Sequence, residues 1–375
     1  MSVRVMHVVA TDQRRGAEVF ASGLVRVLAD LGVDQRVVVL RGHPADADAD
    51  ADAGAIRFDA PTTRLAQAGR SRTGLGQARR LRREIHAYAP DVLQVHGGEA
   101  MKAAALARTK VPLVYRRIGG VPPWLSSGPR RWVYGRLMRR AATVVAVAES
   151  VREETIAVFG LPAGAVVTIP NGVDQQTMTR HRTREAVRHE LGIPSDAAVS
   201  ISLAALVPEK DPLGVLELLM PYLRDRPDAV HLFVGTGPLI AELRTRADFL
   251  SPGSVRCLGE RTDVADILGA ADLLLFASPP GGMEGMPASL IEAGLCGLPT
   301  VGFDVAGARE VVDRDVTGYL VPWRDAAALR ARMAGLMDDA PSRVAMGIRA
   351  KKHCARFDIR AVAPRYLQLY RGLTA

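Results

Sequence analysis

Two glutamates eight positions apart, Glu284 and Glu292, mark the part of this 375-residue chain best suited to chemistry. Glu284 lies in a glycine-rich stretch after the apolar run Leu273–Phe276, and Glu292 lies among apolar residues further along. A helix is expected to begin near Pro287, because proline suits the first helical position. If helical rise applied throughout, the two glutamate backbones would lie about 12 Å apart.

The start of this predicted helix offers a site for an anion. Backbone N–H groups of Met286, Ala288 and Ser289 would lie between the two carboxylates, at the positive end of the helix dipole. A separation of about 12 Å is close to the length of a nucleoside diphosphate sugar from its sugar ring to its ribose. A glutamate in a helix is usually a solvated surface residue, but the settings of Glu284 and Glu292 favour a ligand-binding role.

Lys210 is placed for a second contact with an anion. It follows the predicted strand Val199–Leu206 and precedes Asp211-Pro212, a good N-cap followed by a good first helical residue. An ammonium group at this point can neutralise the charge that develops on a leaving diphosphate. A lysine without such neighbours would more often be an ordinary surface residue.

Further motifs accompany these residues. They are Gly297-Leu-Pro299-Thr, Asp304-Val-Ala-Gly307-Ala-Arg-Glu310, the run from Asp313 to Thr317-Gly318-Tyr-Leu-Val, Pro170-Asn171-Gly172-Val173-Asp174 and the loop Gly16-Ala17-Glu18. Together with Glu284-x7-Glu292 they resemble the motifs of the GT4 family of retaining glycosyltransferases. The resemblance covers most of the chain from Arg4 to about Val321, and it is strongest after Ser278.

The resemblance implies a GT-B fold, in which two Rossmann-like domains face a cleft and the last helix returns to the first domain. It also implies transfer of a hexose-type sugar from a UDP- or GDP-linked donor to a hydroxyl acceptor. Retention of the anomeric configuration is expected, with neither a metal ion nor another cofactor. In such enzymes the residue matching Glu292 holds the ribose hydroxyls, and the one matching Glu284 contacts the donor sugar. Lys210 and Glu284 are thus the expected catalytic residues.

Further donor contacts follow from the resemblance, together with one departure from the family pattern. The expected donor-binding positions besides Glu292 are Gly16, Gly235, Gly259, Arg261, Met286, Pro287, Ala288 and Ser289. Gly235 and Gly259 follow predicted strands, and plain turns would explain these glycines equally well. Relatives usually carry an arginine five positions before the residue that matches Lys210, as a second diphosphate clamp. This chain has Ala205 there.

Residues of the acceptor side are expected in the first half of the chain. His96 ends a predicted strand before Gly97-Gly98, which makes it a candidate for the cleft, although a core or capping role is equally compatible. Many relatives place a histidine after the next strand, where this chain has Tyr115-Arg116-Arg117-Ile118-Gly119. If Arg116 or Arg117 faces the cleft, it would suit an anionic acceptor or help to hold the leaving phosphate.

Strands and helices that alternate from end to end must position these residues. Apolar runs without alternation, such as Val3–Ala10 and Val199–Leu206, are typical of strands buried on both faces of a parallel sheet. The pattern restarts after Asn171-Gly172, which predicts two doubly wound α/β domains. We expect an acceptor-side domain over 1–174, a nucleotide-sugar domain over 175–355 and a helix over 356–375 that crosses back.

The excess positive charge belongs to the first half of the chain. Residues 1–175 hold 25 Lys and Arg against 16 Asp and Glu, whereas residues 176–375 hold 24 of each kind. A predicted helix over 130–140 carries five arginines beside apolar residues: Arg130, Arg131, Arg136, Arg139 and Arg140 with Trp132, Val133, Leu137 and Met138. This composition suits a helix on an anionic membrane surface, and with it a lipid-linked acceptor. Packing of the apolar residues onto the sheet, with solvated arginines, stays open.

Composition limits the class of protein to which this chain can belong. No apolar run reaches the roughly 18–20 residues of a membrane span, so we expect a cytoplasmic protein that can reach the inner face of the membrane. The three cysteines lack metal-ligand spacing, and Ala45–Ala53 has the composition of a flexible acidic loop. A nucleotide-sugar epimerase and a basic nucleic-acid-binding protein stay open. We expect no nucleic-acid partner, because such a partner would leave Glu284 and Glu292 unexplained.

Overall fold

The computed structural model describes residues 3–42, 55–66, 74–250, 252–280 and 284–374. The chain divides into two compact units, of which unit 1 comprises residues 1–173 and 359–375 and unit 2 comprises residues 174–358. The sequence pattern predicts these boundaries between residues 174 and 175 and between residues 355 and 356. The acidic stretch Ala45–Ala53 lies outside the described residues.

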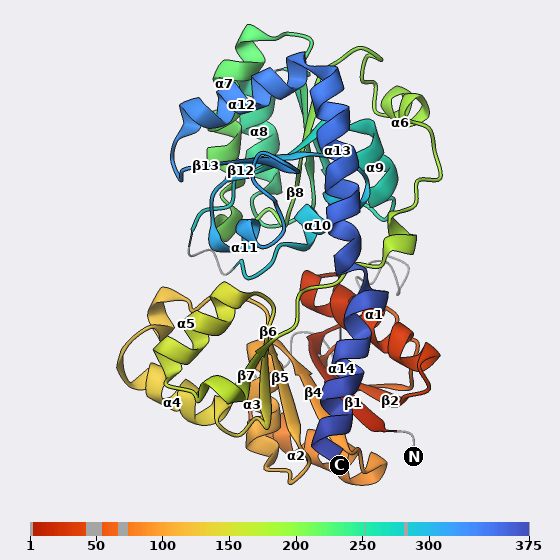
Figure 1. The fold of residues 1–375 in the computed structure, drawn as a ribbon, viewed down its shortest axis with the longest axis vertical. Helices are drawn as coiled ribbons and strands as arrows, with labels where there is room; N and C mark the ends of the chain where they lie inside the picture. The colour runs from red at the N-terminus through yellow and green to blue at the C-terminus, as the bar shows by residue number, and fades with distance from the viewer. Residues whose placement is uncertain (1–2, 43–54, 67–73, 251, 281–283, 375) are drawn as a thin grey trace. The chain divides into compact units, whose positions relative to one another are not determined.

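In the described part of unit 1, seven parallel strands form one sheet (Figure 1). From one edge to the other they are β3 (Thr62–Arg64), β2 (Asp34–Arg41), β1 (Arg4–Thr11), β4 (Val92–His96), β5 (Leu113–Arg117), β6 (Thr143–Ala146) and β7 (Val166–Thr168). The order reverses between β1 and β4, which is where open α/β sheets bind ligands. The sequence pattern does not predict β3, because its three residues include none that is buried.

The helices of unit 1 are α1 (Gly16–Asp30), α2 (Leu75–Tyr88), α3 (Gly97–Ala107), α4 (Gly128–Met138), α5 (Glu149–Phe159) and α14 (Ile359–Thr374), with the 3-10 turns η1 (Pro123–Leu125) and η2 (Ala163–Ala165). The last helix, α14, lies beside α1 (Figure 1). Phe20 and Leu24 of α1 share one buried cluster with Tyr366 and Tyr370 of α14 and with residues of the central strands. The return of the final helix to the first domain is thus confirmed.

The segment that ends the first part of unit 1 is hydrogen-bonded to the start of α14. The Ile359 N–H donates to the Val173 carbonyl oxygen at 2.9 Å. A Cβ at Gly172 would lie 3.2 Å from Ile359 Cα, which is tighter than an ordinary contact, so the close approach favours a glycine. The motif Asn171-Gly172-Val173 therefore serves to seat the start of α14.

In the described part of unit 2, six parallel strands form a second sheet. Their order is β10 (Val255–Gly259), β9 (Val230–Val234), β8 (Val199–Leu203), β11 (Leu273–Phe276), β12 (Thr300–Phe303) and β13 (Gly318–Val321). The order reverses between β8 and β11. Both sheets are doubly wound, which confirms the predicted fold class.

The helices of unit 2 are α6 (Arg184–Glu190), α7 (Pro212–Asp225), α8 (Ile240–Leu250), α9 (Val264–Ala270), α10 (Ala288–Leu295), α11 (Ala306–Arg309), α12 (Ala326–Asp338) and α13 (Ala340–Cys354), with the 3-10 turns η3 (Gln175–Met178), η4 (Pro208–Lys210) and η5 (Ala355–Phe357). Within the described ranges, no helix has the length and apolar content needed to cross a membrane.

Tyr366 tests the contribution of α14 to unit 1. Its side chain is fully buried, and its ring centroid lies 5.9 Å from that of Phe20. Truncating a buried aromatic side chain typically costs about 3–5 kcal/mol of unfolding free energy, so we expect a loss of this order for Tyr366→Ala in urea denaturation. Arg371→Ala, on an exposed position of the same helix, should change the value by less than about 0.5 kcal/mol. Equal midpoints for both variants would contradict this role of α14.

Candidate active site

A pocket in unit 2 opens where the carboxyl ends of β8 and β11 lie side by side. It is lined by Ser202–Leu206 at the end of β8, by Lys210, by Leu274–Ser278 at the end of β11 and by Ser289 of α10. Parallel strands present their carboxyl ends at one edge of the sheet, and the reversal of strand order leaves a crevice there. The pocket therefore lies at the switch point of this sheet.

Lys210 is held at this pocket by a capped turn. The next residue, Asp211, has a left-handed φ of 47° and caps α7 by accepting a hydrogen bond from the Gly214 N–H at 3.1 Å. The Lys210 ammonium contacts a carboxylate oxygen of Glu284. Burial lowers the pKa of Lys210 to about 8, an effect that the nearby Glu209 opposes. The ammonium is thus mostly charged at neutral pH.

Glu284 follows β11 and is supported from the side by α11. A Cβ at Gly307 would lie 2.9 Å from the Gly285 carbonyl oxygen and 3.0 Å from that of Glu284, so only glycine lets α11 approach this backbone. Asp304 accepts a 2.5 Å hydrogen bond from Arg309 and also pairs with Arg314. The motif from Asp304 to Glu310 therefore acts as a scaffold for the Glu284 loop.

Glu292 lies in α10, which begins one residue later than predicted. Pro287 is the N-cap residue with extended backbone, and Ala288 is the first helical residue. Leu290 is buried and Glu292 is half-buried, while Ser289 lines the pocket. The first N–H groups of an α-helix lack intrahelical partners, so the pocket side of α10 can donate hydrogen bonds to an anion.

The three predicted donor-binding glycines differ in their structural settings. A Cβ at Gly235, whose φ is 134°, would lie 2.0 Å from the Ala204 carbonyl oxygen, so packing within unit 2 alone requires this glycine. Gly259 has a left-handed φ of 72° at a register shift in the sheet. A Cβ at Gly16, the first residue of α1, would meet no atom within 4 Å. Donor contacts of all three stay predictions.

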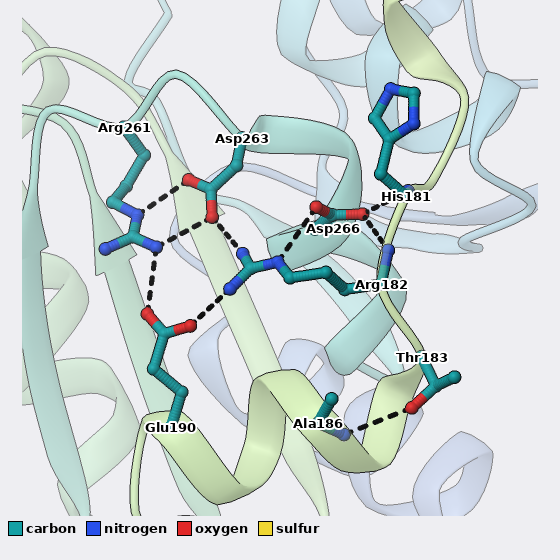
Figure 2. A network of polar contacts seen from close by, with 8 residues as sticks. All are labelled: His181, Arg182, Thr183, Ala186, Glu190, Arg261, Asp263 and Asp266. Atoms are coloured by element: carbon teal, nitrogen blue, oxygen red, sulfur yellow. Dashed lines mark hydrogen bonds and ion pairs between the residues drawn. The ribbon is translucent and has the colours of Figure 1, made fainter.

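Arg261 belongs to a network of ion pairs that Figure 2 shows. Its guanidinium donates to Asp263 at 2.7 and 2.8 Å and to Glu190 at 3.2 Å. Arg182 pairs with the same two acids and donates to Asp266 at 3.0 Å. The network fastens α6 to the loop before α9, so residues 184–190 form a helix that is packed on the rest of unit 2. A donor contact of Arg261 stays a prediction.

Arg116, a predicted acceptor-side residue, is buried inside unit 1. Its guanidinium carbon lies 3.6 Å from the ring centroid of Phe20, and its Nη2 donates to Asn171 Oδ1 at 2.8 Å. Burial lowers the pKa of Arg116, whereas Tyr366 and Glu18 oppose this shift. Arg116 therefore links Asn171, in the motif from Pro170 to Asp174, to α1 and α14.

His96 and Arg117 are buried as well. His96 Nε2 lies 3.3 Å from His7 Nδ1, and His7 Nε2 lies 3.0 Å from Gln35 Oε1. Burial lowers the pKa of His7 to about 4 and that of His96 well below its ordinary value, so both rings are neutral at pH 7. The Arg117 guanidinium carbon lies 5.4 Å from the ring centroid of Phe159. These positions favour the core role for His96, and contact of any of the three with an acceptor stays a prediction.

Sequence reasoning missed the partnership of Lys210 with Glu284 and the place of Ser202 in the pocket lining. Both depend on the adjacency of β8 and β11, and the strand order typical of a doubly wound sheet could have indicated that adjacency but not the contact between the side chains. Met286, a predicted donor-binding residue, is buried. Across the described ranges, no group of three or more His, Cys, Asp or Glu side chains is arranged to hold a metal ion.

Two doubly wound units with a final helix that returns to the first define a GT-B fold. The HepE protein of Anabaena, solved in complex with UDP and glucose, has this architecture. It superposes with a TM-score of 0.84 over 98% of this chain and 99% of its own, at 21% sequence identity. This likeness concerns the fold.

Family models extend the comparison to the sequence. The model described as Glycosyltransferase Family 4 matches residues 14–177, and the one described as Glycosyl transferases group 1 matches residues 183–353. The two matches leave residues 178–182 between them, and the chain belongs to the GT4-type glycosyltransferases.

Two curated relatives illustrate the range of the family. The D-inositol 3-phosphate glycosyltransferase of Kineococcus radiotolerans is 28% identical over 302 residues, which is 75% of this chain and 66% of the relative. A GDP-mannose-dependent monoacylated alpha-(1-6)-phosphatidylinositol monomannoside mannosyltransferase of Corynebacterium glutamicum is 31% identical over 229 residues, or 58% of this chain and 59% of the relative. The matched regions thus span about three-fifths to two-thirds of these relatives.

The ion-pair network of unit 2 generates a prediction about acid stability. Burial disfavours the charged form of Asp266, yet bonds from the backbone of His181 and from Arg182 hold the pKa of this carboxyl below its usual range. A depressed folded-state pKa means that the stabilisation is complete above the unfolded pKa of about 3.9 and is lost as the pH falls below it. Asp266→Asn should lower the melting temperature at pH 7 by about 3–6 °C.

The pH dependence provides the check on this prediction. The difference between the melting temperatures of wild type and Asp266→Asn should shrink between pH 5 and pH 3, because the unfolded chain takes up a proton in this range while the folded carboxylate, whose pKa is lower, does so only at more acidic pH. Asp248→Asn, on an exposed position of α8, should change the melting temperature little at either pH. A difference for Asp266→Asn that stays constant with pH would rule out this electrostatic explanation.

Proposed function

We propose that this chain is a retaining, metal-independent glycosyltransferase that moves a hexose-type sugar from a UDP- or GDP-linked donor to a hydroxyl acceptor. The observation that carries the proposal is the pocket at the β8–β11 switch point, where Lys210 meets Glu284 and α10 presents its first turn. Ammonium and backbone N–H groups suit a diphosphate, and carboxylates suit sugar hydroxyls.

Each of these residues then has its own role in the sugar transfer. Lys210 and the first turn of α10 hold the diphosphate, and Glu292 accepts hydrogen bonds from the ribose hydroxyls. The bond between the anomeric carbon and the β-phosphate oxygen breaks, and the acceptor oxygen forms its bond to the same face of that carbon. The acceptor proton passes to the departing diphosphate oxygen. Lys210 stabilises the negative charge that grows on this leaving group.

Support for a nucleotide-sugar donor comes from the similar proteins. HepE was solved with UDP and glucose, and the corynebacterial relative is named as GDP-mannose-dependent. Ala205 stands where many relatives have a second diphosphate-binding residue, an arginine. Lys210 therefore contributes more of the diphosphate binding in this chain. Since a bound ligand raises the apparent stability of a protein, a thermal-shift screen of UDP-, GDP- and deoxythymidine-linked sugars would identify the donor.

Kinetics of two variants test the assigned roles. Glu292→Ala and Lys210→Ala should each lower turnover at least about a hundredfold, the scale of one well-placed electrostatic group. Loss of Glu292 should mainly weaken nucleotide binding, whereas loss of Lys210 should lower the rate even at saturating donor. Glu209→Gln, next to Lys210 but exposed, should remain close to wild type. Near-wild-type kinetics of both alanine variants in folded protein would refute the site.

We also propose that unit 1 makes a peripheral contact with an anionic membrane, which would suit a lipid-linked acceptor. On α4, Trp132 is 64% and Val133 49% exposed, and Trp124 of η1 is 55% exposed. Arg136 lies over the Trp132 ring at 5.9 Å. The apolar residues Trp132 and Val133 are thus open to solvent rather than packed on the sheet.

The five arginines of this segment are not equivalent. Arg139 donates to the carbonyl oxygens of Phe159 and Gly160 at 3.1 Å, and Arg140 donates to that of Ala105 at 2.6 Å. Both therefore bind carbonyl groups at or near the ends of neighbouring helices. Arg130, Arg131 and Arg136 are the exposed cations beside Trp132, so they are the ones available to lipid headgroups.

Liposome co-sedimentation tests this contact. At about 1 kcal/mol per basic residue near an anionic surface, replacing Arg130, Arg131 and Arg136 by Gln should reduce binding to anionic vesicles about a hundredfold or more. Binding should need anionic lipid and fade with salt. A matched control replaces Arg79, Arg82 and Arg83 of α2, which are also exposed, by Gln. Equal losses in both triple variants would point to general charge, and no binding at low salt would remove the proposal.

A further inference from the structure

The pocket of unit 2 already holds an anionic group at its lysine. The Glu284 carboxylate contacts the Lys210 ammonium, and both side chains are about four-fifths buried, with 19% and 21% exposed. Ser278 Oγ lies 3.5 Å from Glu284 Oε1. A partly buried ammonium binds a carboxylate oxygen through the same kind of charge-assisted hydrogen bond that it would make with a phosphate oxygen.

One ammonium must therefore serve two anions. Among the described residues that line the pocket, Lys210 is the only Lys or Arg. Ala205 lines the same pocket and offers no charge. A diphosphate that enters the pocket and the carboxylate of Glu284 consequently compete for Lys210, and a charged group that loses its partner in a partly buried site is costly.

We propose that Glu284 is a built-in competitor of the donor diphosphate and leaves Lys210 readily only when the entering nucleotide still carries its sugar. The inference rests on the proposed function. A nucleotide sugar gives the freed carboxylate new partners, because sugar hydroxyls donate hydrogen bonds to it. A free nucleoside diphosphate lacks the hydroxyls of that sugar and places a like charge nearby. The exchange thus favours the donor over the diphosphate product and expels that product once the sugar has been transferred.

Equilibrium binding tests the competition without any turnover. UDP, GDP and inorganic pyrophosphate are titrated by calorimetry, at fixed pH and salt, into wild type and Glu284→Gln. Since an interaction that alters the affinity for a ligand commonly does so about 5- to 150-fold, we expect the variant to bind pyrophosphate and its preferred diphosphate about tenfold more tightly. The affinity advantage of the nucleotide sugar over the free diphosphate should shrink in the same variant.

Two matched variants isolate the contact with Lys210. Glu209→Gln removes the same charge one position from Lys210, and it should tighten pyrophosphate binding by less than about threefold because an exposed charge is screened. In a Lys210→Gln background, adding Glu284→Gln should improve binding by less than about threefold, the effect of like charge alone, since the contested ammonium is gone. Circular dichroism confirms the fold of each variant, and Glu284→Ala replaces Glu284→Gln if the latter is unfolded.

The outcomes separate the inference from the proposed function. Unchanged or weaker pyrophosphate binding by Glu284→Gln would overturn the competitor role, as would an equal gain in Glu209→Gln or an equal gain without Lys210. If pyrophosphate shows the Lys210-dependent gain while neither UDP nor GDP binds any variant, the competition stands and the nucleotide-sugar function fails.

Discussion

The carboxyl ends of β8 and β11 are neighbours in the unit 2 sheet, and the whole candidate site depends on this adjacency. The segment after β8 brings Lys210, and the segment after β11 brings Glu284, to one pocket. Close backbone contacts hold both segments in place. Gly235 abuts the carbonyl oxygen of Ala204, and Gly307 abuts that of Glu284. These glycines therefore act on the site through packing, whether or not they touch a donor.

Buried guanidinium groups hold separate segments of this arginine-rich chain together. In unit 1, buried Arg116 joins Asn171 to the ring of Phe20. In unit 2, buried Arg188 donates to the Ala270 carbonyl oxygen and pairs with Asp272. A guanidinium has five donors in a planar fork, so it can satisfy several carbonyl oxygens at once. Part of the positive charge is thus used inside the protein, and only the exposed remainder is available to partners.

Sequence patterns predicted the fold well and the site in part. Apolar runs marked the buried strands, and the restart after Asn171-Gly172 marked the second unit. Spacing and residue type placed Lys210 between a strand and a helix, and the structure has it at the end of the 3-10 turn η4, between β8 and α7. The pattern failed at β3, which is short and carries no buried residue. It also could not show that Arg116 is buried, because an arginine in a strand reads as exposed until its partners are known.

The sequence by itself determined the alternation of strands and helices, because hydrophobic period and turn residues act over short range. It also indicated which residues carry groups of a kind that can bind a diphosphate. Only the tertiary structure decided which groups meet. The pairing of Lys210 with Glu284 depends on strand order, and the engagement of Arg261 by Asp263 and Glu190 depends on the packing of α6. Such contacts join segments distant in the chain, which local pattern does not encode.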